Sequence, residues 1–366
     1  MFSIYSSISL SWHIVRTGMV FLPCILCSPM LLLPSTLCPI STLLELLVWS
    51  VEMAGPVYIK LSQWASTRRD IFPGIVCDRL AKLQRETRPH TWGQTMVVLN
   101  KEWGLGWEEV VKLDREVVGS GCCAQVYKGR VVMDGVEKEV AVKVVHPGLC
   151  RQLELDLLVM STGAKLVTWL VPGTDWLSLE RAVKEFKELM VGQVDMRKEA
   201  ANLDKFRQNF RDHPRVFFPA PFNQYCGSDV LVEDWIDGVG IHHYMDQTGT
   251  EGELLRKELA ELGVDMLLKM VFRDNYWHGD LHPGNILVTH GNRLGVLDTG
   301  VASSLSKGDR ENLIHTFRAV VLGESCKVGE LFLERSYHEC LDKEAFKKEM
   351  QSIVEEARSA QLSLDR

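Results

Sequence analysis

The chain has 366 residues, of which 46% are hydrophobic and 24% are charged, and its formal net charge at pH 7 is −7. These proportions are those of an ordinary globular protein and exclude a disordered or low-complexity chain. An acidic balance provides no basic field for nucleic acid, so we expect no nucleic-acid partner. The ten cysteines are too sparse for a disulfide scaffold, which favours free thiols in a reducing compartment.

The N-terminal part of the chain is strongly apolar. Residues 17–44 form a run of 28 positions without a charged side chain, and about 20 apolar residues are enough for a transmembrane helix. A second apolar stretch, Ile40 to Met53, carries only Glu45 and Glu52 as charges. Four prolines are expected to break or kink any helix through the first run, namely Pro23, Pro29, Pro34 and Pro39.

We therefore expect residues 1–54 to form a hydrophobic targeting or membrane segment. A kinked, re-entrant or interfacial arrangement suits the prolines better than one straight span, and membrane lipids become the expected partner. We expect residues 17–53 to hold the protein at a membrane rather than to form part of its core. A buried hydrophobic hairpin, a secretory signal and an organelle transit peptide are the alternatives.

The next part of the chain, residues 55–110, is expected to be a helical extension. After the Gly55-Pro56 break, Val57 to Thr67 predicts a helix with Lys60 and Gln63 three residues apart on one face. A second polar-faced helix is expected from Asp78 to Glu86.

Residues 111–237 are expected to form a small lobe of mixed strands and helices. Valine-rich runs from Val110 to Val145, separated by glycine-bearing turns, predict strands. Apolar periodicity predicts helices over residues 151–211, and Val230 to Trp235 predicts one more short strand.

Residues 238–366 are expected to form a larger, mainly helical lobe. Its strongest pattern is an amphipathic helix from Glu251 to Arg273. Two short strands, Ile286 to Val288 and Leu294 to Leu297, are predicted around a Gly-Asn turn, and helices close the chain. Only 66 residues follow Gly300, so we expect this lobe to be incomplete.

The most specific motif joins residues 277–285 to residues 295–300. Asp280 precedes Asn285 by five positions on one loop. Asp298 follows 13 residues after Asn285, and the two predicted strands between them form a hairpin that brings Asp298 back beside this loop. In protein kinases the first Asp of this pattern accepts the proton of the substrate hydroxyl, while the Asn and the second Asp hold magnesium. A loop with an Asx-turn explains the first half alone, but not a second motif at this interval.

A glycine-bearing segment upstream supports the same chemistry. Gly119, Gly121, Ala124 and Val126 fit the pattern GxGxxGxV, with Ala124 in the third glycine position. Glycines between two strands let backbone N–H groups approach phosphate oxygens. Taken alone, the segment is explained equally well by a plain hairpin turn.

A lysine follows the glycine segment at the end of an apolar run. Lys143 closes the tetrapeptide VAVK, the form of a strand lysine that pairs with α- and β-phosphates. Such a lysine can also extend to the surface, but the ordered series of four motifs makes that interpretation the weaker one. The lysine needs a carboxylate from a helix, and Glu199, 56 residues later, is the candidate. Glu180 and Glu185 compete with it.

Together these motifs resemble the UbiB-type, aarF-domain-containing atypical kinases associated with coenzyme Q biosynthesis. Lys60 and Gln63 match the KxGQ segment of that family, with Ser62 in place of its glycine. Of the family's ExD motif only Asp195 matches, because Gln193 replaces the first acid.

The resemblance extends over roughly residues 50–330. Glu199 falls where the family places its lysine-pairing glutamate, and Val230 to Gly238 is similar to the hinge whose backbone would meet adenine. Residues 119–124 replace the family's alanine-rich loop.

The resemblance implies an α+β, two-lobed protein-kinase-like fold that binds ATP and Mg²⁺. Lys60 and Gln63 would be regulatory, because the family's KxGQ segment is thought to fold over the nucleotide pocket and limit the access of protein substrates. The implied site consists of Gly119, Gly121, Ala124, Val126, Lys143 and Glu199 around the nucleotide, Asn285 and Asp298 on magnesium, and Asp280 as base or water positioner.

The implied function is that of an ATP-binding atypical kinase or ATPase at an organelle membrane. The organelle would be the mitochondrion, with a plastid as the alternative, and quinone-biosynthesis proteins would be partners in coenzyme Q formation or lipid homeostasis. A non-catalytic pseudokinase that acts as a nucleotide-gated lipid or protein binding module stays open. A small-molecule phosphotransferase of the aminoglycoside or choline type shares HxDxxxxN but lacks the KxGQ-like segment.

Overall fold

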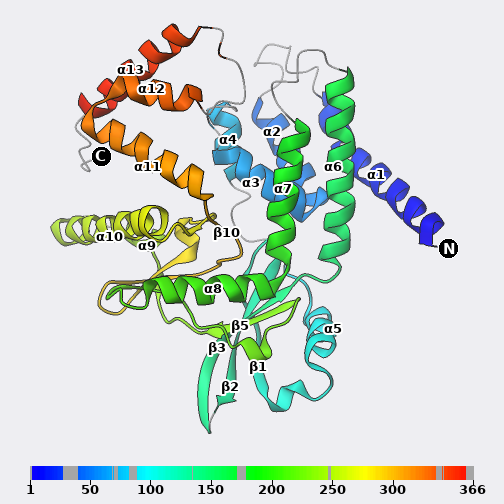
Figure 1. Cartoon of the computed structure of the whole chain (residues 1–366). Helices are drawn as coiled ribbons and strands as arrows, with labels where there is room; N and C mark the ends of the chain where they lie inside the picture. Colours follow the sequence, from blue (N-terminus) through cyan, green and yellow to red (C-terminus); the bar gives the residue numbers. More distant parts are fainter. Residues whose placement is uncertain are drawn as a thin grey trace. The chain divides into compact units, whose positions relative to one another are not determined.

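The computed structural model describes residues 2–27, 40–67, 69, 73–81, 89–133, 135–170, 179–245, 249–334, 340 and 342–359 (Figure 1). The chain divides into two compact units. The first unit consists of Met1–His242 and His282–Val301, and the second unit consists of His243–Leu281 and Ala302–Arg366. The expected large lobe, 238–366, is therefore split, because strands within 282–301 pair with strands of the first unit.

The first unit is built on a four-stranded antiparallel sheet in the order β1-β2-β3-β5 (Figure 1). Its strands are β1 (Val111–Ser120), β2 (Ala124–Met133), β3 (Val136–Val145) and β5 (Val230–Asp234). Val131, Val140 and Val142 are fully buried, since β-branched side chains fill a pleated surface well. Helix α5 (Trp92–Trp103) packs the buried Leu99 into the same core. The strands expected in this region are confirmed.

A second small sheet completes the strand structure of this unit. Its order is β4 (Val216–Phe217), β9 (Arg293–Val296), β8 (Ile286–Thr289) and β6 (Val239–Gly240). The hairpin between β8 and β9 turns at Gly291 and Asn292, which have φ values of 76° and 53°. Two successive positive φ values are what a tight hairpin turn requires, so the expected Gly-Asn turn is confirmed.

Helices lie between the strands β3 and β5 in the sequence. They are α6 (Leu149–Leu170), α7 (Leu179–Val194) and α8 (Met196–Phe210), which confirm the helical region expected over 151–211. Helices α6 and α7 run side by side in Figure 1 and are in contact. Asp195 caps α8 by accepting a hydrogen bond from the backbone N–H of Arg197, which fixes where this helix begins.

Helices also form the described residues at the N-terminal end of the first unit. They are α1 (Phe2–Cys27), α2 (Ile40–Ala54), α3 (Pro56–Thr67) and α4 (Gly74–Leu80). The helix expected over Val57–Thr67 is confirmed. The helix expected from Asp78 is displaced, because it begins at Gly74 and ends at Leu80; residues 82–88 lie outside the described part of the chain.

The apolar N-terminus differs from expectation in two respects. Helix α1 runs through Pro23 without ending there, so the expected break does not occur at this position; the other three prolines lie outside the described residues. One face of α2 also belongs to the core of this unit, because Val51 is buried in a cluster with Ile59, Ala65 and Leu80, whereas Trp49 of the same helix is exposed. No helix in the described part of the chain is long and apolar enough to cross a membrane.

Helix α1 has an inverted distribution of polarity. His13 and Thr17 face inward, and His13 Nε2 lies 2.6 Å from Oδ1 of the fully buried Asp156 of α6. The opposite face exposes large apolar side chains at helical spacing, namely Trp12, Val15, Met19, Leu22 and Leu26. We call these five residues the α1 stripe.

The second unit is mainly helical. Its long helix α10 (Thr250–Leu268) continues into a π-helical turn at Lys269–Arg273, which confirms the helix expected over 251–273. A two-stranded ladder joins β7 (Trp277–His278) to β10 (Ala302–Ser303). Three helices follow, α11 (Lys307–Leu322), α12 (Ser325–Glu334) and α13 (Lys343–Ser359).

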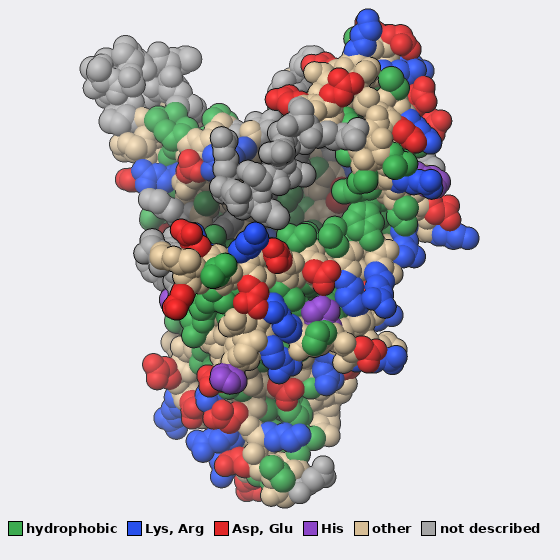
Figure 2. All heavy atoms as spheres, turned by 90° about the vertical axis from the view of Figure 1, so that its left-hand side faces the viewer, with side chains coloured by type: hydrophobic (Ala, Val, Ile, Leu, Met, Phe, Trp, Pro, Cys, Tyr) green, Lys and Arg blue, Asp and Glu red, His purple; other side chains and the backbone are tan. Residues whose placement is uncertain are grey.

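Charged side chains are distributed without separation of sign on the face drawn in Figure 2. Lys and Arg side chains are interspersed there with Asp and Glu side chains and with apolar ones. This mixed distribution agrees with the modest net charge of −7.

Candidate nucleotide-binding site

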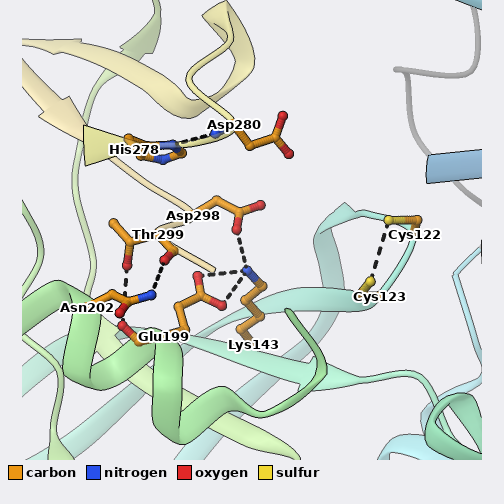
Figure 3. Close-up of polar contacts among 9 residues, drawn as sticks. All are labelled: Cys122, Cys123, Lys143, Glu199, Asn202, His278, Asp280, Asp298 and Thr299. Atoms are coloured by element: carbon orange, nitrogen blue, oxygen red, sulfur yellow. Dashed lines mark hydrogen bonds and ion pairs between the residues drawn. The ribbon is translucent and has the colours of Figure 1, made fainter. Parts of the chain in front are cut away.

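The centre of the candidate site is a buried lysine between two carboxylates (Figure 3). Lys143 of β3 donates hydrogen bonds to both carboxylate oxygens of Glu199 of α8, each at 2.9 Å, and to Oδ1 of Asp298 at 3.1 Å. The predicted Lys143–Glu199 ion pair is therefore confirmed. Its competitor Glu185 instead pairs with Arg181 on an exposed face of α7.

Hydrogen bonds fix α8 against the segment that carries Asp298. Asn202 Nδ2 donates to the carbonyl oxygen of Thr299 at 2.7 Å, and the Thr299 hydroxyl donates to the carbonyl oxygen of Glu199 at 3.3 Å (Figure 3). Asp298 has a φ of 54°, in the left-handed region that few residues other than glycine adopt. Such strained backbone is typical of functional sites, where the surrounding contacts hold it in place.

The charges of this cluster are strongly coupled. Burial alone would lower the pKa of Lys143, but the carboxylates of Asp298 and Glu199 outweigh burial and raise it, so the lysine stays charged. Burial raises the pKa of Glu199 to about 7, although the charge of Lys143 opposes this effect. The lysine is therefore a permanent cation, which suits it to bind phosphate oxygens.

A third acid, Glu233 of β5, lies close enough to interact with this cluster. Burial, together with the charge of Glu199, raises the pKa of Glu233 to about 8. Its Oε2 atom is buried and has no hydrogen-bond partner among the described residues. Ala141 pairs with Glu233 and Lys143 with Leu231, so Glu233 and Lys143 belong to the same face of the sheet.

The glycine-bearing segment forms the turn between β1 and β2. Gly121 N donates to the carbonyl oxygen of Ala124 at 2.8 Å. A Cβ atom added to Gly119 would meet no atom of the described residues within 4 Å. Gly119 pairs with Val126, which in turn pairs with Lys143. The turn and the lysine are thus fixed on neighbouring strands, with open space above Gly119 for a ligand.

A chain of hydrogen bonds through two histidines holds the backbone of this turn. His146 Nε2 donates to the carbonyl oxygen of Gly121 at 2.8 Å, and His90 Nδ1 lies 2.7 Å from His146 Nδ1. Because His146 donates from Nε2, its Nδ1 must accept a hydrogen bond from the His90 Nδ1, so the His146 ring is neutral in this arrangement. Burial, with the neighbouring His146, lowers the pKa of His90 to about 4. His90 Nε2 then contacts the Thr95 hydroxyl at 2.9 Å.

The two residues expected on magnesium lie at one end of the β8–β9 hairpin. Asn285 is buried immediately before β8, and its carbonyl oxygen accepts a hydrogen bond at 2.8 Å from the backbone N–H of Leu297, the residue before Asp298. Amide and carboxylate oxygens are the ligands that Mg²⁺ prefers. No group of three or more His, Cys, Asp or Glu side chains among the described residues is arranged to hold a metal.

Asp280 belongs to the second unit, whereas the residues of the lysine cluster and of the glycine turn belong to the first. Its backbone N–H donates to Nδ1 of His278 at 3.1 Å (Figure 3). His278 is buried on the short strand β7. The imidazole thereby fixes the backbone at Asp280.

The two residues expected to regulate the site lie on α3. Lys60 and Gln63 are both half-buried there, and the intervening Ser62 is buried. The charge of Lys60 acts on the Cys123 thiol in the glycine turn. Lys60 is therefore within electrostatic reach of the turn.

Sequence reasoning missed the side chain of Glu233 and the His90–His146 pair. The segment 230–238 was assigned only a backbone role, although alternation along two paired strands places Glu233 on the face of Lys143. No sequence signal joins His90 to His146, which are 56 positions apart and meet only through the packing of α5 on the sheet.

A glycine turn, a strand lysine held by a helix glutamate and an Asp-x-Gly segment after a hairpin define a protein-kinase-like fold. Residues 82–332 match the sequence model of the ABC1 atypical kinase-like domain. The chain belongs to this family. The expected α+β protein-kinase-like fold and the resemblance to the UbiB-type, aarF-domain-containing kinases are confirmed.

Curated relatives agree with this assignment. The chain is 30% identical over 398 aligned residues to a mitochondrial ABC1 family protein of Schizosaccharomyces pombe, covering 89% of this chain and 57% of the relative. It is 28% identical to a mitochondrial ABC1 family protein of Saccharomyces cerevisiae, covering 87% and 58%. A probable protein kinase UbiB of Cronobacter sakazakii is 31% identical, covering 79% and 53%. The chain thus spans little more than half the length of these relatives.

A solved structure shares the fold. It is a Mycobacterium tuberculosis protein in complex with erythromycin, with a TM-score of 0.56 and 24% sequence identity. The alignment covers 86% of this chain and 78% of that protein.

Proposed function

We propose that this chain binds ATP with Mg²⁺ and acts as an atypical kinase or ATPase in coenzyme Q biosynthesis or lipid homeostasis. The observation that carries the proposal is the bidentate pairing of Lys143 with Glu199, which holds a permanent cation beside the glycine turn. A fixed cation costs no reorganisation when phosphate arrives, and preorganised charge is the main means by which phosphoryl transfer is accelerated. The names of the UbiB relatives support the kinase assignment.

The residues present fit a magnesium–nucleotide complex. Gly119 leaves space for phosphates over its backbone, Gly121 closes the turn through its hydrogen bond to the Ala124 carbonyl, and Val126 lies on β2 opposite Gly119. Asn285 and Asp298 supply amide and carboxylate oxygens from one end of a hairpin. The ion would neutralise charge on the phosphates when bound.

Asp280 is the proposed base or water positioner. It follows the buried His278, which fixes the backbone of the segment through the Asp280 N–H. An aspartate five residues before the magnesium-holding asparagine is the protein-kinase arrangement for accepting the proton of an attacking hydroxyl or orienting a water. The side chain would act mainly in the transition state.

We place the protein at a mitochondrial membrane, with membrane lipids and quinone-biosynthesis proteins as partners. Two relatives are named as mitochondrial. The α1 stripe supports the membrane part of the proposal, because exposed apolar stripes on a helix with a polar inner face are typical of interfacial contact. An interfacial helix replaces the span that the sequence allowed.

A second candidate is a non-catalytic, nucleotide-gated binding module. Gln193, in place of the family's first ExD acid, favours it: its Oε1 atom is buried without a hydrogen-bond partner among the described residues. A neutral amide cannot take over the charge of a carboxylate. Such a module would bind nucleotide without turnover.

One experiment tests the proposal and separates the two candidates. Thermal unfolding of the whole chain should shift upward with Mg²⁺ and ATP or ADP, since a ligand at a hundredfold excess over Kd stabilises the native state by about 2.7 kcal/mol. ADP release is measured in parallel, with and without phospholipid vesicles. A shift with ADP release supports the enzyme, and a shift without it supports the module. The absence of any shift contradicts both.

A further inference from the structure

The glycine turn carries two adjacent cysteines, Cys122 and Cys123, that the proposed chemistry does not use. Their sulfur atoms lie 3.6 Å apart within hydrogen-bonding contact (Figure 3). Both side chains are present as thiols, with Cys123 buried and Cys122 half-buried. These two thiols lie in the turn that would bind phosphates. A chemical change at their sulfur atoms would therefore alter the proposed nucleotide site.

The two thiols face different surroundings. Cys122 packs against the apolar cluster of the N-terminal helices that contains Val51 and Ile59. Cys123 is buried immediately before Ala124, the first residue of β2, whose partner on β3 is Val145. The pair therefore lies between the cluster of the N-terminal helices and the start of β2, next to the strand that carries Lys143.

We infer that Cys122 and Cys123 form a redox-modified dithiol whose oxidation to an internal disulfide prevents nucleotide from binding at the glycine turn. This regulation rests on the proposed nucleotide site. The oxidant is a hydroperoxide, and the reductant is a small dithiol or a dithiol protein.

The half-buried Cys122 reacts first. Its thiolate attacks one peroxide oxygen, the O–O bond breaks, and the products are a sulfenic acid on Cys122 and hydroxide. The Cys123 sulfur then attacks the sulfenic sulfur, the S–S bond forms, and the sulfenic oxygen leaves as water after taking the thiol proton. Two thiols lose two electrons and hydrogen peroxide becomes two waters.

The order of the two cysteines follows from their surroundings. The hydrogen bond with Cys122, together with burial, raises the pKa of Cys123, and Lys60 and Lys143 oppose this only in part. Cys123 therefore stays protonated during the first step and reacts in the second step as the resolving thiol. The neighbouring sulfur at 3.6 Å makes the second step intramolecular, which favours the internal bridge over reaction with a separate thiol.

The bridge cannot form without moving the backbone of the turn. Adjacent Cα atoms lie about 3.8 Å apart across a trans peptide, whereas ordinary disulfides join Cα atoms about 4.4–6.8 Å apart. The turn is held by His146, which donates from Nε2 to the Gly121 carbonyl at 2.8 Å and from its backbone N–H to the Cys123 carbonyl at 2.9 Å. Distorting residues 121–123 therefore disturbs the backbone N–H groups that would meet phosphate. A strained bridge is also easily reduced, as a reversible switch requires.

The test compares reduced and oxidised full-length protein. Hydrogen peroxide treatment, alkylation of remaining thiols and peptide mapping should find a bridge between Cys122 and Cys123 that dithiothreitol reverses. Affinity for Mg-ADP should fall about tenfold or more on oxidation and return on reduction. In Cys122→Ser and in Cys123→Ser, the affinity for Mg-ADP should be the same before and after peroxide treatment. Each treated variant is compared with the untreated form of the same variant. Cys150→Ser and Cys326→Ser, at exposed thiols elsewhere, should retain it.

Three results would overturn the inference. A bridge that forms while Mg-ADP affinity stays unchanged removes the regulation but leaves the nucleotide site intact. Formation of a mixed disulfide with added glutathione at Cys122, instead of the internal bridge, removes the resolving role of Cys123. Failure of the reduced wild-type protein to bind Mg-ADP overturns the proposed function and this regulation with it, whereas the peptide map still reports the sulfur chemistry.

Discussion

Lys143 and Asp298 are bound to each other at 3.1 Å, although the proposed site gives them ligands of opposite charge. Lys143 would bind phosphate oxygens, and Asp298 would bind a divalent cation. Mg-nucleotide must therefore exchange one internal ion pair for two external ones, lysine to phosphate and aspartate to metal. Glu199 accepts two further hydrogen bonds from Lys143, so the lysine would still have a carboxylate partner if Asp298 bound a metal.

Removal of either partner of the Lys143–Glu199 pair should weaken nucleotide binding. Lys143→Ala leaves the buried Glu199 without its cation, and Glu199→Ala leaves Lys143 with Asp298 as its remaining carboxylate, so each change should lower the unfolding free energy, by about 3–5 kcal/mol at most. The loss of unfolding free energy in the double variant should be smaller than the sum of the two single losses, because the second substitution removes the charge that the first one left unpaired. Denaturant unfolding and Mg-ADP titration of all four proteins give this comparison. Strict additivity would mean that another carboxylate holds the lysine.

Asp298→Asn should abolish the magnesium dependence of nucleotide binding. The amide keeps the size of the side chain but loses the charge that would hold the ion and that now pairs with Lys143. Titration of ADP with and without Mg²⁺ measures the effect. Asp309→Asn, at an aspartate in the first turn of α11 in the second unit, is the control and should leave the dependence unchanged. Equal magnesium dependence in wild type and Asp298→Asn would refute the metal role.

Asp280→Asn should remove turnover while leaving nucleotide affinity nearly unchanged. The carboxylate would accept a proton or orient a water only as the reaction proceeds, so its loss acts on the transition state. ADP release and ADP affinity are measured on the same preparation. If both fall together, Asp280 contributes to binding or folding instead.

Glu233→Gln should make the protein relatively more stable at alkaline pH. Burial raises the pKa of Glu233 to about 8, above its ordinary value of 4.5. A group whose folded-state pKa is raised contributes its full stability below pH 4.5 and loses it as pH rises toward 8. The variant lacks this loss, so its stability relative to wild type should increase by about 1 kcal/mol or more between pH 5 and pH 8.5. Denaturant unfolding at both pH values checks this.

The matched control for this measurement is Glu185→Gln. Glu185 is an exposed acid that pairs with Arg181 one helical turn away, so its removal should leave the pH profile nearly parallel to that of wild type. Parallel profiles for both variants would show that Glu233 ionises normally in the folded protein.

Replacing Val15, Met19 and Leu22 of the α1 stripe by serine should weaken binding to phospholipid vesicles. Each large apolar side chain is worth about 1.5–3 kcal/mol when fully buried, so partial burial of three should account for at least about tenfold in affinity. Vesicle co-sedimentation measures it. Leu189→Ser with Val191→Ser, at exposed positions of α7, is the control. Unchanged vesicle binding in the triple variant would show that the α1 stripe is not the surface that contacts the membrane.

Local chemistry made much of the site predictable. The spacing of Asp280, Asn285 and Asp298 and the tetrapeptide ending at Lys143 are set by the turns and strands that carry them. Glu199 could be chosen over Glu180 and Glu185 because the lysine motif and the family pattern pointed to it, and the ion pair at 2.9 Å confirms the choice.

Long-range packing made the rest unpredictable. His90 and His146 meet only because α5 covers the sheet, and the buried environment that raises the pKa of Glu233 comes from segments distant in sequence. The apolar N-terminus was misjudged for a related reason: composition reports how hydrophobic a helix is, but not which face turns toward its neighbours. Only the packed structure shows that α1 turns its polar residues inward.

The His13–Asp156 contact determines the rotational setting of α1. If the helix rolled about its axis to bury the stripe, His13 would move to the outside and the buried Asp156 would lose this hydrogen bond; its Oδ2 atom has no partner among the described residues. That state is strongly disfavoured, because a buried charge without its partner costs several kcal/mol. The His13–Asp156 hydrogen bond thus opposes a rotation of α1 that would bury the α1 stripe. The stripe therefore stays exposed even when only water contacts it.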